Sequence, residues 1–573
     1  MNFEISGGNP QARIELVNQR EENGVFYTDV VMQLQEKAVP QKFKITWKLP
    51  ACDCYSVWSP SLRDSRHLGP NWSKRRTEAR LAAWMPLQSV ISLGGKNRLT
   101  IALSDAATPT AIATGICEED GCIDCTVEFF TLPTTPVESY RAVLRLDMRD
   151  IPYYDSIYDV VNWWEKDYYA PAPVPEAAKM PMDSLWYSFH QLLDREQILE
   201  ECRLSKAAGM ETVIIDDGWQ TEDNSRGYAY CGDWKVASSK IPDMKAFVDQ
   251  LHAIGMKVML WYSVPFVGLH SSAYEQFRDM LLDGSGNGRD FWALDPRYPQ
   301  VRQYLVKTYK EAVAAWGLDG LKLDFIDSFI LRGKSIEEDP RRDYASLEDG
   351  VDALMREVTE VLYQQNPEVL LEFRQTYVGP NIRRYGNMLR VADCPGDALR
   401  NRGDVVNLRL TSGKTAVHSD MLMWHYDDSV ESAAAQLISV LYSVPQISMR
   451  LNRLREDHRR MLSYYLSFWR QNREVLLEGK LTASNPEAGY SQVCASLGDK
   501  AVITAYTQPV IAGAYADFAV VNGTASQSLY FKNCTGRNYR IVDCMGQEQA
   551  SGVFGPEAIG ELIVPRAGIV FVK

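Results

Sequence analysis

The sequence lacks the marks of several large protein classes. No apolar run approaches the roughly 18 residues that span a bilayer, so we expect no transmembrane helix and no membrane partner. The N-terminal residues show neither the basic stretch nor the apolar core of a signal peptide, which predicts a cytoplasmic protein. Positive charge is in deficit, because 61 Lys and Arg stand against 74 Asp and Glu, a formal net charge of -13. Such an acidic protein is a poor match for nucleic acid.

Histidine is scarce as well. The chain has seven, and none of them falls in H-x-H or H-E-x-x-H spacing, which argues against a catalytic zinc site. The serine elbow G-x-S-x-G does not occur, and no glycine-rich phosphate loop follows the first predicted strand of the central region. We therefore expect a chemistry that requires no metal and no organic cofactor.

The 11 cysteines, an odd number, predict mostly free thiols in a cytoplasmic chain. Five of them gather in the N-terminal region and include one C-x2-C pair of the kind that zinc sites use. Small buried residues on the strands of a β domain explain the same cysteines without a metal. The sequence leaves both interpretations open for Cys52, Cys54, Cys117, Cys122 and Cys125.

The pattern of apolar residues divides the chain into three regions. Residues 1–175 alternate apolar and polar residues in short runs, as in 43–49, and end in a proline-rich linker at 169–175. This pattern predicts an N-terminal β-sandwich. Short alternating runs return over residues 479–573 and predict a small C-terminal β-sandwich. Residues 176–478 follow a different pattern.

In this central region, short apolar runs alternate with stretches of helical periodicity, such as residues 301–316 and 346–365. Eight strands with intervening helices over roughly 290 residues predict a (β/α)8 or TIM barrel, so the fold class is α/β. A doubly wound open sheet is the structural alternative. The predicted strands are residues 185–190, 211–217, 257–263, 320–326, 369–374, 388–393, 415–420 and 446–451.

The fourth predicted strand carries a candidate catalytic carboxylate. Lys322 and Asp324 share one face, because side chains alternate along a strand. The cation keeps the carboxylate ionised and the strand holds it rigid, which is what a carboxylate nucleophile needs. A barrel of this kind builds its active site at the carboxyl ends of its strands.

Further carboxylates, cations and aromatic rings stand at these predicted strand ends. Carboxylates and cations hydrogen-bond the hydroxyls of sugars, and aromatic rings stack on sugar faces. Two carboxyls across the ring then suffice to cleave a glycosidic bond. Trp234 and Trp261 are candidates for sugar contact or for core packing. The candidate site residues are Asp216, Asp217, Trp219, Trp234, Trp261, Lys322, Asp324, Arg374, Arg390, Asp393 and Cys394.

An ordered set of short motifs runs through the barrel region. They are Asp216-Asp217-Gly218-Trp219, Gly232-Asp233-Trp234, Ile241-Pro242, Gly255-Met256-Lys257, Leu294-Asp295-Pro296 and Lys322-Leu323-Asp324. This set resembles glycoside hydrolase family 36, of the α-galactosidase clan of retaining enzymes. The resemblance covers roughly residues 183–475 and implies β domains on both sides of the barrel, a carbohydrate substrate and no cofactor. It also leaves room for a homo-oligomer.

The resemblance implies roles for individual residues. Asp324 resembles the nucleophile, and Asp393 matches the acid/base at the end of the sixth strand. The implied reaction is a double displacement that releases terminal α-linked galactose-type sugars with retained configuration. We expect Lys322 to keep Asp324 ionised and a less polar surrounding to raise the pKa of Asp393. The implied sugar ligands are Asp216 and Asp217 on the 4- and 6-hydroxyls, Lys322 on ring hydroxyls and Trp261 in the pocket wall.

Two segments depart from the family pattern. Residues 372–377 replace a fifth-strand segment that is usually rich in Cys, Ser and Gly, which leaves the sugar open, α-N-acetylgalactosamine included. The sixth-strand motif differs too, and Asp397 is the weaker candidate for the acid. At Asp243 and Asp327 we expect a helix cap or a supporting role. A transglycosylase is the alternative enzyme, and a sugar-binding protein without catalysis is the non-enzyme alternative.

Overall fold

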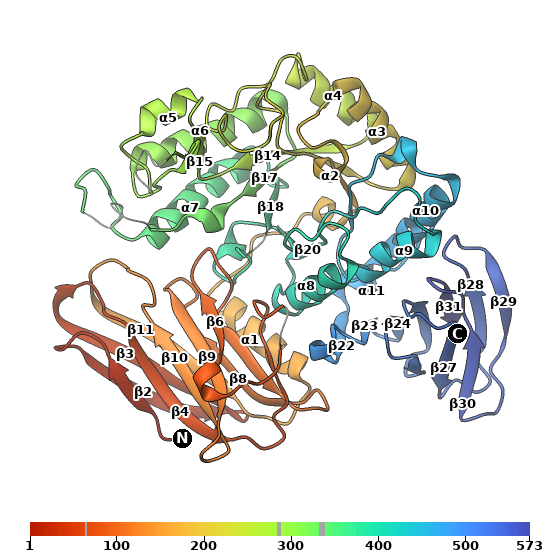
Figure 1. Cartoon of the computed structure of the whole chain (residues 1–573), viewed down its shortest axis with the longest axis horizontal. Coiled ribbons are helices and arrows are strands. Elements are labelled where there is room, and N and C mark those ends of the chain that lie inside the picture. Colours follow the sequence, from red (N-terminus) through yellow and green to blue (C-terminus); the bar gives the residue numbers. More distant parts are fainter. Residues whose placement is uncertain (64–65, 283–287, 332–337, 375) are drawn as a thin grey trace.

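The computed structural model describes residues 1–63, 66–282, 288–331, 338–374 and 376–573. Figure 1 shows an N-terminal pair of sheets, a central region of strands enclosed by helices, and a C-terminal group of strands on the other side of that region. The predicted α/β barrel with β domains on both sides is therefore confirmed. The domain limits placed at residues 175 and 478 stay predictions.

The N-terminal part is a sandwich of two antiparallel sheets, with strand orders β1-β4-β10-β9-β6 and β2-β3-β11-β8-β7-β5. Along β4, Phe43, Ile45 and Trp47 are buried while Lys44 and Lys48 are exposed, so alternate residues face the core and the solvent. The strands are β1 Glu4–Gly7, β2 Arg13–Glu22, β3 Val25–Ala38, β4 Phe43–Pro50, β5 Ser56–Trp58, β6 Arg75–Ala79, β7 Leu87–Ile91, β8 Asn97–Leu103, β9 Thr110–Cys117, β10 Cys122–Phe129 and β11 Val137–Asp147.

The five N-terminal cysteines lie on or near these strands. Cys117 and Cys122 face each other across the β9–β10 pair, and Cys125 is buried in the sandwich core. All 11 cysteines of the chain are free thiols. Within the described part of the chain, no group of three or more His, Cys, Asp or Glu residues is placed to hold a metal ion.

The central barrel consists of parallel strands in the order β20-β19-β18-β17-β14-β13-β12-β21, eight within the described residues. The ring closes through a short parallel contact of His418 with Val444, and the Val444 N–H donates to the Val417 carbonyl across 2.8 Å. The strands are β12 Met182–Ser184, β13 Thr212–Ile215, β14 Lys257–Ser263, β17 Gly320–Asp324, β18 Leu370–Arg374, β19 Met388–Arg390, β20 Ala416–His418 and β21 Gln446–Ile447.

The amino end of the barrel is filled with apolar side chains. Ala178, in a short 3-10 turn ahead of β12, packs with residues from six of the strands, and its carbonyl lies 2.8 Å from His418 Nε2. This plug leaves only the carboxyl end of the barrel open to a substrate. The residues packed with Ala178 are Met182, Ile214, Met259, Leu370, Met388 and Ala416.

Two predicted strand positions are wrong in an informative way. Residues 185–190 form the short helix α2 (Trp186–Phe189), and the first strand lies just before it at Met182–Ser184. The aromatic run favoured a strand by propensity, but tertiary packing set the helical turn. The sixth strand ends at Arg390, so Asp393 stands in a loop three residues beyond it.

Helices surround the barrel and cover its outer face (Figure 1). The predicted helices at 301–316 and 346–365 correspond to α6 and α7. Pro299 at the first turn and Gly317 just past the end delimit α6, as expected for these residue types. The main helices are α1 Tyr153–Asp167, α3 Arg195–Ala208, α4 Met244–Ile254, α5 Ser272–Phe277, α6 Pro299–Trp316, α7 Leu347–Gln365, α8 Ala398–Thr411, α9 Val430–Ser439, α10 Glu456–Gln471 and α11 Arg473–Glu478.

The C-terminal part again consists of two sheets, in the orders β22-β23-β24-β26-β31-β28-β29 and β25-β27-β30. No helix in the described ranges is both long and apolar enough to cross a membrane. The strands are β22 Lys480–Ser484, β23 Gln492–Leu497, β24 Lys500–Ala505, β25 Val510–Ala512, β26 Asp517–Asn522, β27 Ser528–Lys532, β28 Asn538–Val542, β29 Glu548–Val553, β30 Ile559–Ile563 and β31 Ile569–Val572. A hairpin of β15 (Phe266–Gly268) and β16 (Phe291–Ala293) rises from the barrel after β14.

Candidate active site

Asp324 ends strand β17 at the carboxyl end of the barrel and is almost completely buried. Its Oδ2 accepts the indole N–H of Trp261 across 2.8 Å. Its Oδ1 accepts the Nε–H of Arg374 across 2.5 Å and the backbone N–H of Phe325 across 2.7 Å. Phe325 has a φ of 65°, in the left-handed region, so the chain turns sharply directly after the carboxylate. A bulky residue in this region carries strain of the kind that clusters at functional sites.

The environment of Asp324 keeps its carboxylate ionised. Burial by itself raises the pKa of Asp324, but the charges of Arg374 and Lys322, together with hydrogen bonds from Arg374 and Trp261, hold that pKa below its ordinary value. The expectation that Lys322 supports the ionised form is therefore met. Arg374, which the sequence placed only as a sugar ligand, contributes more than Lys322 does.

Lys322 lies on the same face of β17 and points to the second strand of the barrel. Its Nζ contacts Asp216 Oδ2 at 2.5 Å, and both side chains are buried. The backbone N–H of Asp217 donates to Asp216 Oδ1 across 2.9 Å. Lys322 of β17 and Asp216 after β13, both candidate site residues, therefore meet in space although they lie far apart in the chain.

Asp217 is buried between two glutamines. Gln191 Nε2 donates to its Oδ2 across 2.8 Å, and Gln220 Nε2 donates to its Oδ1 across 2.7 Å. Burial raises the pKa of Asp217 to about 6, against the opposing effect of the Gln220 hydrogen bond. The two glutamines hold the carboxyl plane in a fixed orientation, and neither of them was singled out by the sequence.

Asp393 lies at the rim of this cluster. Its side chain is 43% exposed, whereas the side chain of Arg374 beside it is 6% exposed. Arg374 Nη1 donates to both carboxylate oxygens of Asp393, each at 3.0 Å, and Arg390 Nη2 donates to Asp393 Oδ1 across 2.8 Å. The single guanidinium group of Arg374 thus contacts Asp324 and Asp393 together.

This arrangement overturns one expectation about Asp393. A less polar surrounding was expected to raise its pKa. Burial does act in that direction, but the charges of Arg390, Arg374 and Lys322 outweigh it and hold the pKa of Asp393 well below its ordinary value. The sequence indicated that Arg374 and Arg390 lie at strand ends, but it did not indicate that both contact Asp393.

Arg390 connects Asp393 to a deeper layer of carboxylates. It lies on β19 beside Arg374 of β18 in the parallel register, and its Nη1 contacts Asp420 Oδ1 at 2.5 Å. Its Nε lies 3.8 Å from Glu372 Oε1. Burial raises the pKa of both Asp420 and Glu372, while the charge of Arg390 opposes the rise in each. Asp420 was recognisable as a carboxylate at the seventh strand end, although it was left out of the candidate site residues.

Two of the candidate tryptophans pack in a layer behind the site. Trp219 has no exposed surface, and its indole N–H donates to the Trp261 carbonyl across 2.8 Å. Its ring stacks on Trp234 at 6.0 Å and meets Tyr262 edge-on at 5.3 Å. Trp234 also packs on Trp261 at 6.0 Å. The structure therefore places Trp219 and Trp234 where they support Trp261 and, through it, Asp324.

An aromatic wall that the sequence did not identify lies beside Trp261. Tyr228 stacks on Trp261 with ring centroids 6.4 Å apart, and it meets Phe325 at 5.2 Å. Phe266 and Phe291, from the β15–β16 hairpin, contact Tyr228 at 5.2 and 5.1 Å. These residues come from a loop and a hairpin without regular periodicity, so no local pattern pointed to them.

The remaining predicted residues fall into supporting positions. Cys394 is buried, and its backbone N–H donates to Asp420 Oδ2 across 2.7 Å. Asp243 caps helix α4 and Asp397 caps helix α8, each accepting a backbone N–H three residues on. Asp327 accepts the Thr376 hydroxyl across 2.8 Å. The cap or supporting role expected for Asp243 and Asp327 is confirmed, and Gln375 of the 372–377 segment lies outside the described residues.

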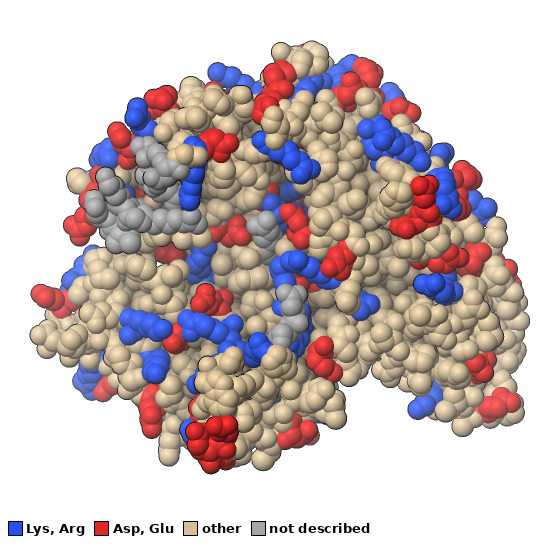
Figure 2. Space-filling model, viewed as in Figure 1, with Lys and Arg blue, Asp and Glu red and all other residues tan. Residues whose placement is uncertain are grey.

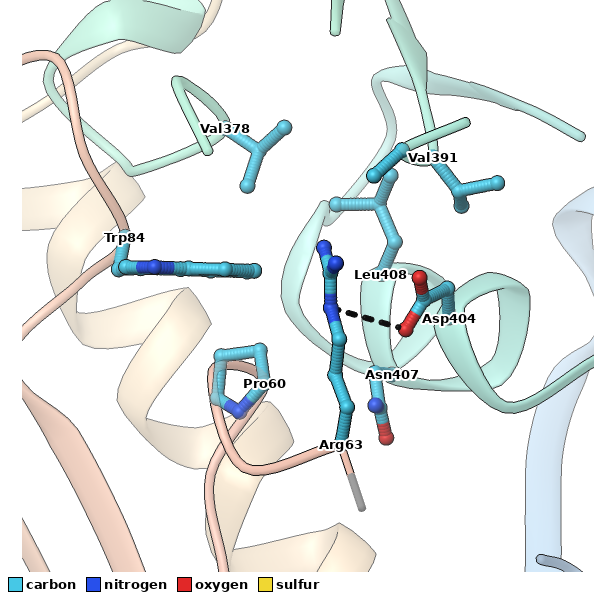
Figure 3. A pocket seen from close by; sticks show the side chains of 9 residues that line it. Pro60, Arg63, Trp84, Val378, Val391, Asp404, Asn407 and Leu408 are labelled. Atoms are coloured by element: carbon cyan, nitrogen blue, oxygen red, sulfur yellow. Dashed lines mark ion pairs between the residues drawn. The ribbon is translucent and has the colours of Figure 1, made fainter. Parts of the chain in front are cut away.

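The N-terminal sandwich closes one side of the region around Asp393. Figure 3 shows Arg63 reaching between the ring of Trp84 and Asp404 of helix α8, with Val391 beside them. The Arg63 guanidinium lies 4.9 Å from the Trp84 ring centroid and its Nε lies 3.3 Å from Asp404 Oδ1. The half-open pocket that they line has a volume of about 20 Å³, room for about one water molecule.

Charges of both signs gather around this end of the barrel. Figure 2 shows basic and acidic side chains next to one another in the hollow between the N-terminal sheets and the barrel. Buried carboxylate–cation contacts lie within the barrel itself, among them Lys322 with Asp216, Arg374 with Asp324 and Arg390 with Asp420. Paired charges with aromatic rings beside them suit a neutral polyhydroxylated ligand.

The comparisons with known proteins agree with this geometry. A family model described as melibiase matches residues 183–376. The chain is 30% identical over 130 residues to α-galactosidase Mel36A of Lactobacillus acidophilus, which covers 21% of this chain and 16% of that protein. It is 26% identical over 175 residues to the A type blood α-D-galactosamine galactosaminidase of Flavonifractor plautii, over 27% of this chain and 15% of that protein. The matched stretches therefore span only a small part of these relatives.

Solved structures extend the likeness to the whole chain. The galactosidase domain of α-galactosidase-sucrose kinase AgaSK has a TM-score of 0.67 at 13% identity, over 100% of this chain and 85% of that one. A variant of the family 36 α-galactosidase AgaA from Geobacillus stearothermophilus, in complex with raffinose, has a TM-score of 0.65 at 14% identity, over 100% and 86%. At such identities the likeness shows a shared fold. The melibiase match over residues 183–376 agrees with the resemblance of the barrel region to glycoside hydrolase family 36, the α-galactosidase family.

Proposed function

We propose that the protein is a retaining exo-glycoside hydrolase that releases terminal α-linked galactose-type sugars. One observation supports this most strongly: Asp324 and Asp393 lie on opposite sides of one guanidinium group, that of Arg374. Retaining glycosidases need two carboxyl groups that flank the scissile bond at short range, one as nucleophile and one as acid/base.

Asp324 is the better nucleophile of the two. It is rigid, buried and held ionised, and its Oδ2 bonds only to the Trp261 indole among the described contacts. In the proposed first step Asp324 attacks the anomeric carbon, while Asp393 gives a proton to the leaving oxygen. In the second step Asp393 takes a proton from water, which releases the sugar with its α configuration retained.

The proposed sugar subsite lies between Asp324 and the second strand. Asp216, Asp217 and Lys322 offer charged groups for sugar hydroxyls, and Trp261 and Tyr228 offer aromatic faces. Raffinose and stachyose, bound in solved structures of AgaA variants, are the first oligosaccharides to test.

For five candidate residues we propose roles other than direct contact with the sugar. Trp219 and Trp234 are packed behind Trp261, so they hold the indole that bonds to Asp324. Cys394 is buried and fixes Asp420 through its backbone N–H. Arg374 and Arg390 contact the catalytic carboxylates rather than the sugar. They therefore influence sugar binding through the position and charge of Asp324 and Asp393.

A second candidate substrate is an α-galactosaminide, with or without an N-acetyl group. The fifth strand carries Glu372 and Arg374 where the family is rich in small residues, so charged groups stand at the place that commonly faces the 2-substituent. A relative named for activity on galactosamine matches over 27% of the chain.

A panel of aryl α-glycosides tests these proposals. The expected result is hydrolysis of the α-galactoside, with loss of turnover in Asp324→Asn and near-normal turnover in the supporting-residue variant Asp327→Asn. Preferred cleavage of the α-galactosaminide would select the second candidate. Wild-type turnover by Asp324→Asn, or no cleavage of any member, would contradict the proposal. Products formed at high acceptor concentration distinguish hydrolysis from transglycosylation.

A further inference from the structure

Arg374 and the proposed substrate need the same space. A retaining glycosidase places the anomeric carbon and the leaving oxygen between its two carboxyls. In this structure that interval is spanned by Arg374, which donates from Nε to Asp324 at 2.5 Å and from Nη1 to both oxygens of Asp393 at 3.0 Å. A sugar bound to both carboxyls therefore has to displace at least the Nη1 end of the guanidinium.

The two ends of this bridge are not equally fixed. Asp324 is buried at the end of a strand and is also held by Trp261, so its contact with Arg374 Nε can persist. Asp393 stands in a loop beyond β19 with a 43% exposed side chain, so this contact is the one that can open. The Arg374 guanidinium also lies over the Phe325 ring, 5.0 Å from its centroid, which gives the cation a stacking surface beside the site.

Displacement of the guanidinium changes the charge balance at Asp393. In the empty site two arginines contact this carboxylate, whereas after displacement only Arg390 remains, itself paired with Asp420. A neutral sugar also excludes water from Asp393. Both changes favour the protonated carboxyl, which is the form that the acid step requires.

We propose that Arg374 is the positioning residue that keeps Asp393 ionised in the empty site, and that the arriving sugar displaces it so that Asp393 binds one proton from solvent. This inference rests on the proposed function. The proton balance is simple: the carboxylate of Asp393 takes up one proton, Arg374 keeps its charge and its bond to Asp324, and no other bond forms or breaks.

Other titratable groups also face the bridge, and among them the charge of Lys322 lowers the pKa of Asp393. The proposal assigns the change at Asp393 to the displacement of Arg374 and treats the effect of these other groups as constant. These groups are Lys322 on β17, Asp327 after β17, Glu372 on β18, Tyr377 after β18, Asp420 after β20, and Tyr187 on α2.

Calorimetry of galactose binding in two buffers of different ionisation enthalpy tests the proposal, because it counts protons without needing turnover. At about pH 5 the wild type should take up close to one proton per galactose bound. Asp393→Asn should lose this uptake. Arg374→Met should take up markedly less, because its Asp393 is already partly protonated when the site is empty, and Arg374→Lys should fall between. Equal uptake by the wild type and Arg374→Met, or no uptake by the wild type, would overturn the proposal.

A second measurement covers the case in which Arg374→Met fails to fold. In the wild type, the basic limb of the pH profile should lie at least about one pH unit higher for kcat than for kcat/KM, since kcat reports the occupied site and kcat/KM the empty one. Coincident limbs would refute the displacement. If the wild type binds no galactose, the proposed function fails, and the inference fails with it; binding without proton uptake defeats the inference alone.

Discussion

Trp261 donates its indole N–H to Asp324 Oδ2 across 2.8 Å, a bond between strands β14 and β17 in a water-poor site. A hydrogen bond to a charged group contributes about 1.5–3 kcal/mol, so Trp261→Phe should lower kcat/KM by roughly 10- to 100-fold. The bond favours the ionised nucleophile, so its loss should also move the acidic limb of the pH profile to higher pH.

The matched control for this change is Trp469→Phe. Trp469 is equally buried on helix α10 and its indole N–H bonds to backbone carbonyls, but it lies outside the site. Its variant should lose some stability and keep the pH profile of the wild type. A Trp261→Phe enzyme whose profile stays in place would show that the indole does not tune Asp324.

The buried ion pair of Lys322 with Asp216 predicts a strong coupling in stability. Removing one partner leaves a buried charge, so Lys322→Met should cost about 3–5 kcal/mol in the free energy of unfolding. The double variant Lys322→Met, Asp216→Asn should recover much of this loss but no activity, because both groups are proposed sugar ligands. Urea unfolding of the four proteins measures the coupling, and additive losses would mean that the pair is energetically independent.

If Asp393 is the general acid, the loss of rate in a variant without it should depend on the leaving group. Asp393→Ala should slow the first step by about 100- to 10,000-fold for an oligosaccharide, and far less for an aryl galactoside whose leaving group needs no proton. Stopped-flow measurement of the first turnover separates the two cases. A loss of equal size for every leaving group would assign the acid role to another residue.

These predictions depend on residues that the sequence located to different extents. Asp324, Lys322 and Asp216 were candidates because each lies at or near the end of a short apolar run, and the barrel brings such strand ends together. The convergence of Arg374 and Arg390 on Asp393 could not be found in the same way. It depends on the register of β18 against β19 and on where the sixth strand ends, and neither is encoded locally.

The aromatic residues show the same limit. Trp219 was a candidate sugar ligand as part of the Asp216-Asp217-Gly218-Trp219 motif, and tertiary packing buries it against Trp234 and Tyr262. Tyr228 lies in a loop with no periodic pattern, and only the fold brings it to Trp261. Whether an aromatic side chain lines a site or supports it is decided by contacts between distant parts of the chain.

A pair of buried carboxyls far from the proposed chemistry predicts a pH effect on stability. Burial raises the pKa of Asp183, which accepts the Ser205 hydroxyl across 2.6 Å. Burial, with the charge of Asp183, also raises the pKa of Glu201. A carboxyl group whose pKa is raised in the folded state binds more protons there than in the unfolded state. The stability that this group contributes is therefore lost as the pH rises from the ordinary pKa of about 4 towards the raised pKa of the folded state.

Asp183→Asn removes this dependence. Relative to the wild type, its free energy of unfolding should therefore increase with pH, by up to about 1.4 kcal/mol per pH unit across that window. Chemical denaturation at several pH values measures the difference, with the exposed neighbour variant Glu200→Gln as the control. A difference that is constant with pH would show that Asp183 titrates normally in the folded protein.

The central claim is that Asp324 forms a covalent bond to the sugar. Intact-mass and peptide mass spectrometry after incubation with a slow fluorinated α-galactosyl fluoride tests it most directly. The expected result is one glycosyl adduct per chain, on the peptide that contains Asp324, and none in Asp324→Asn. An adduct on another carboxylate, or rapid turnover of the reagent with inverted configuration and no adduct, would contradict the account.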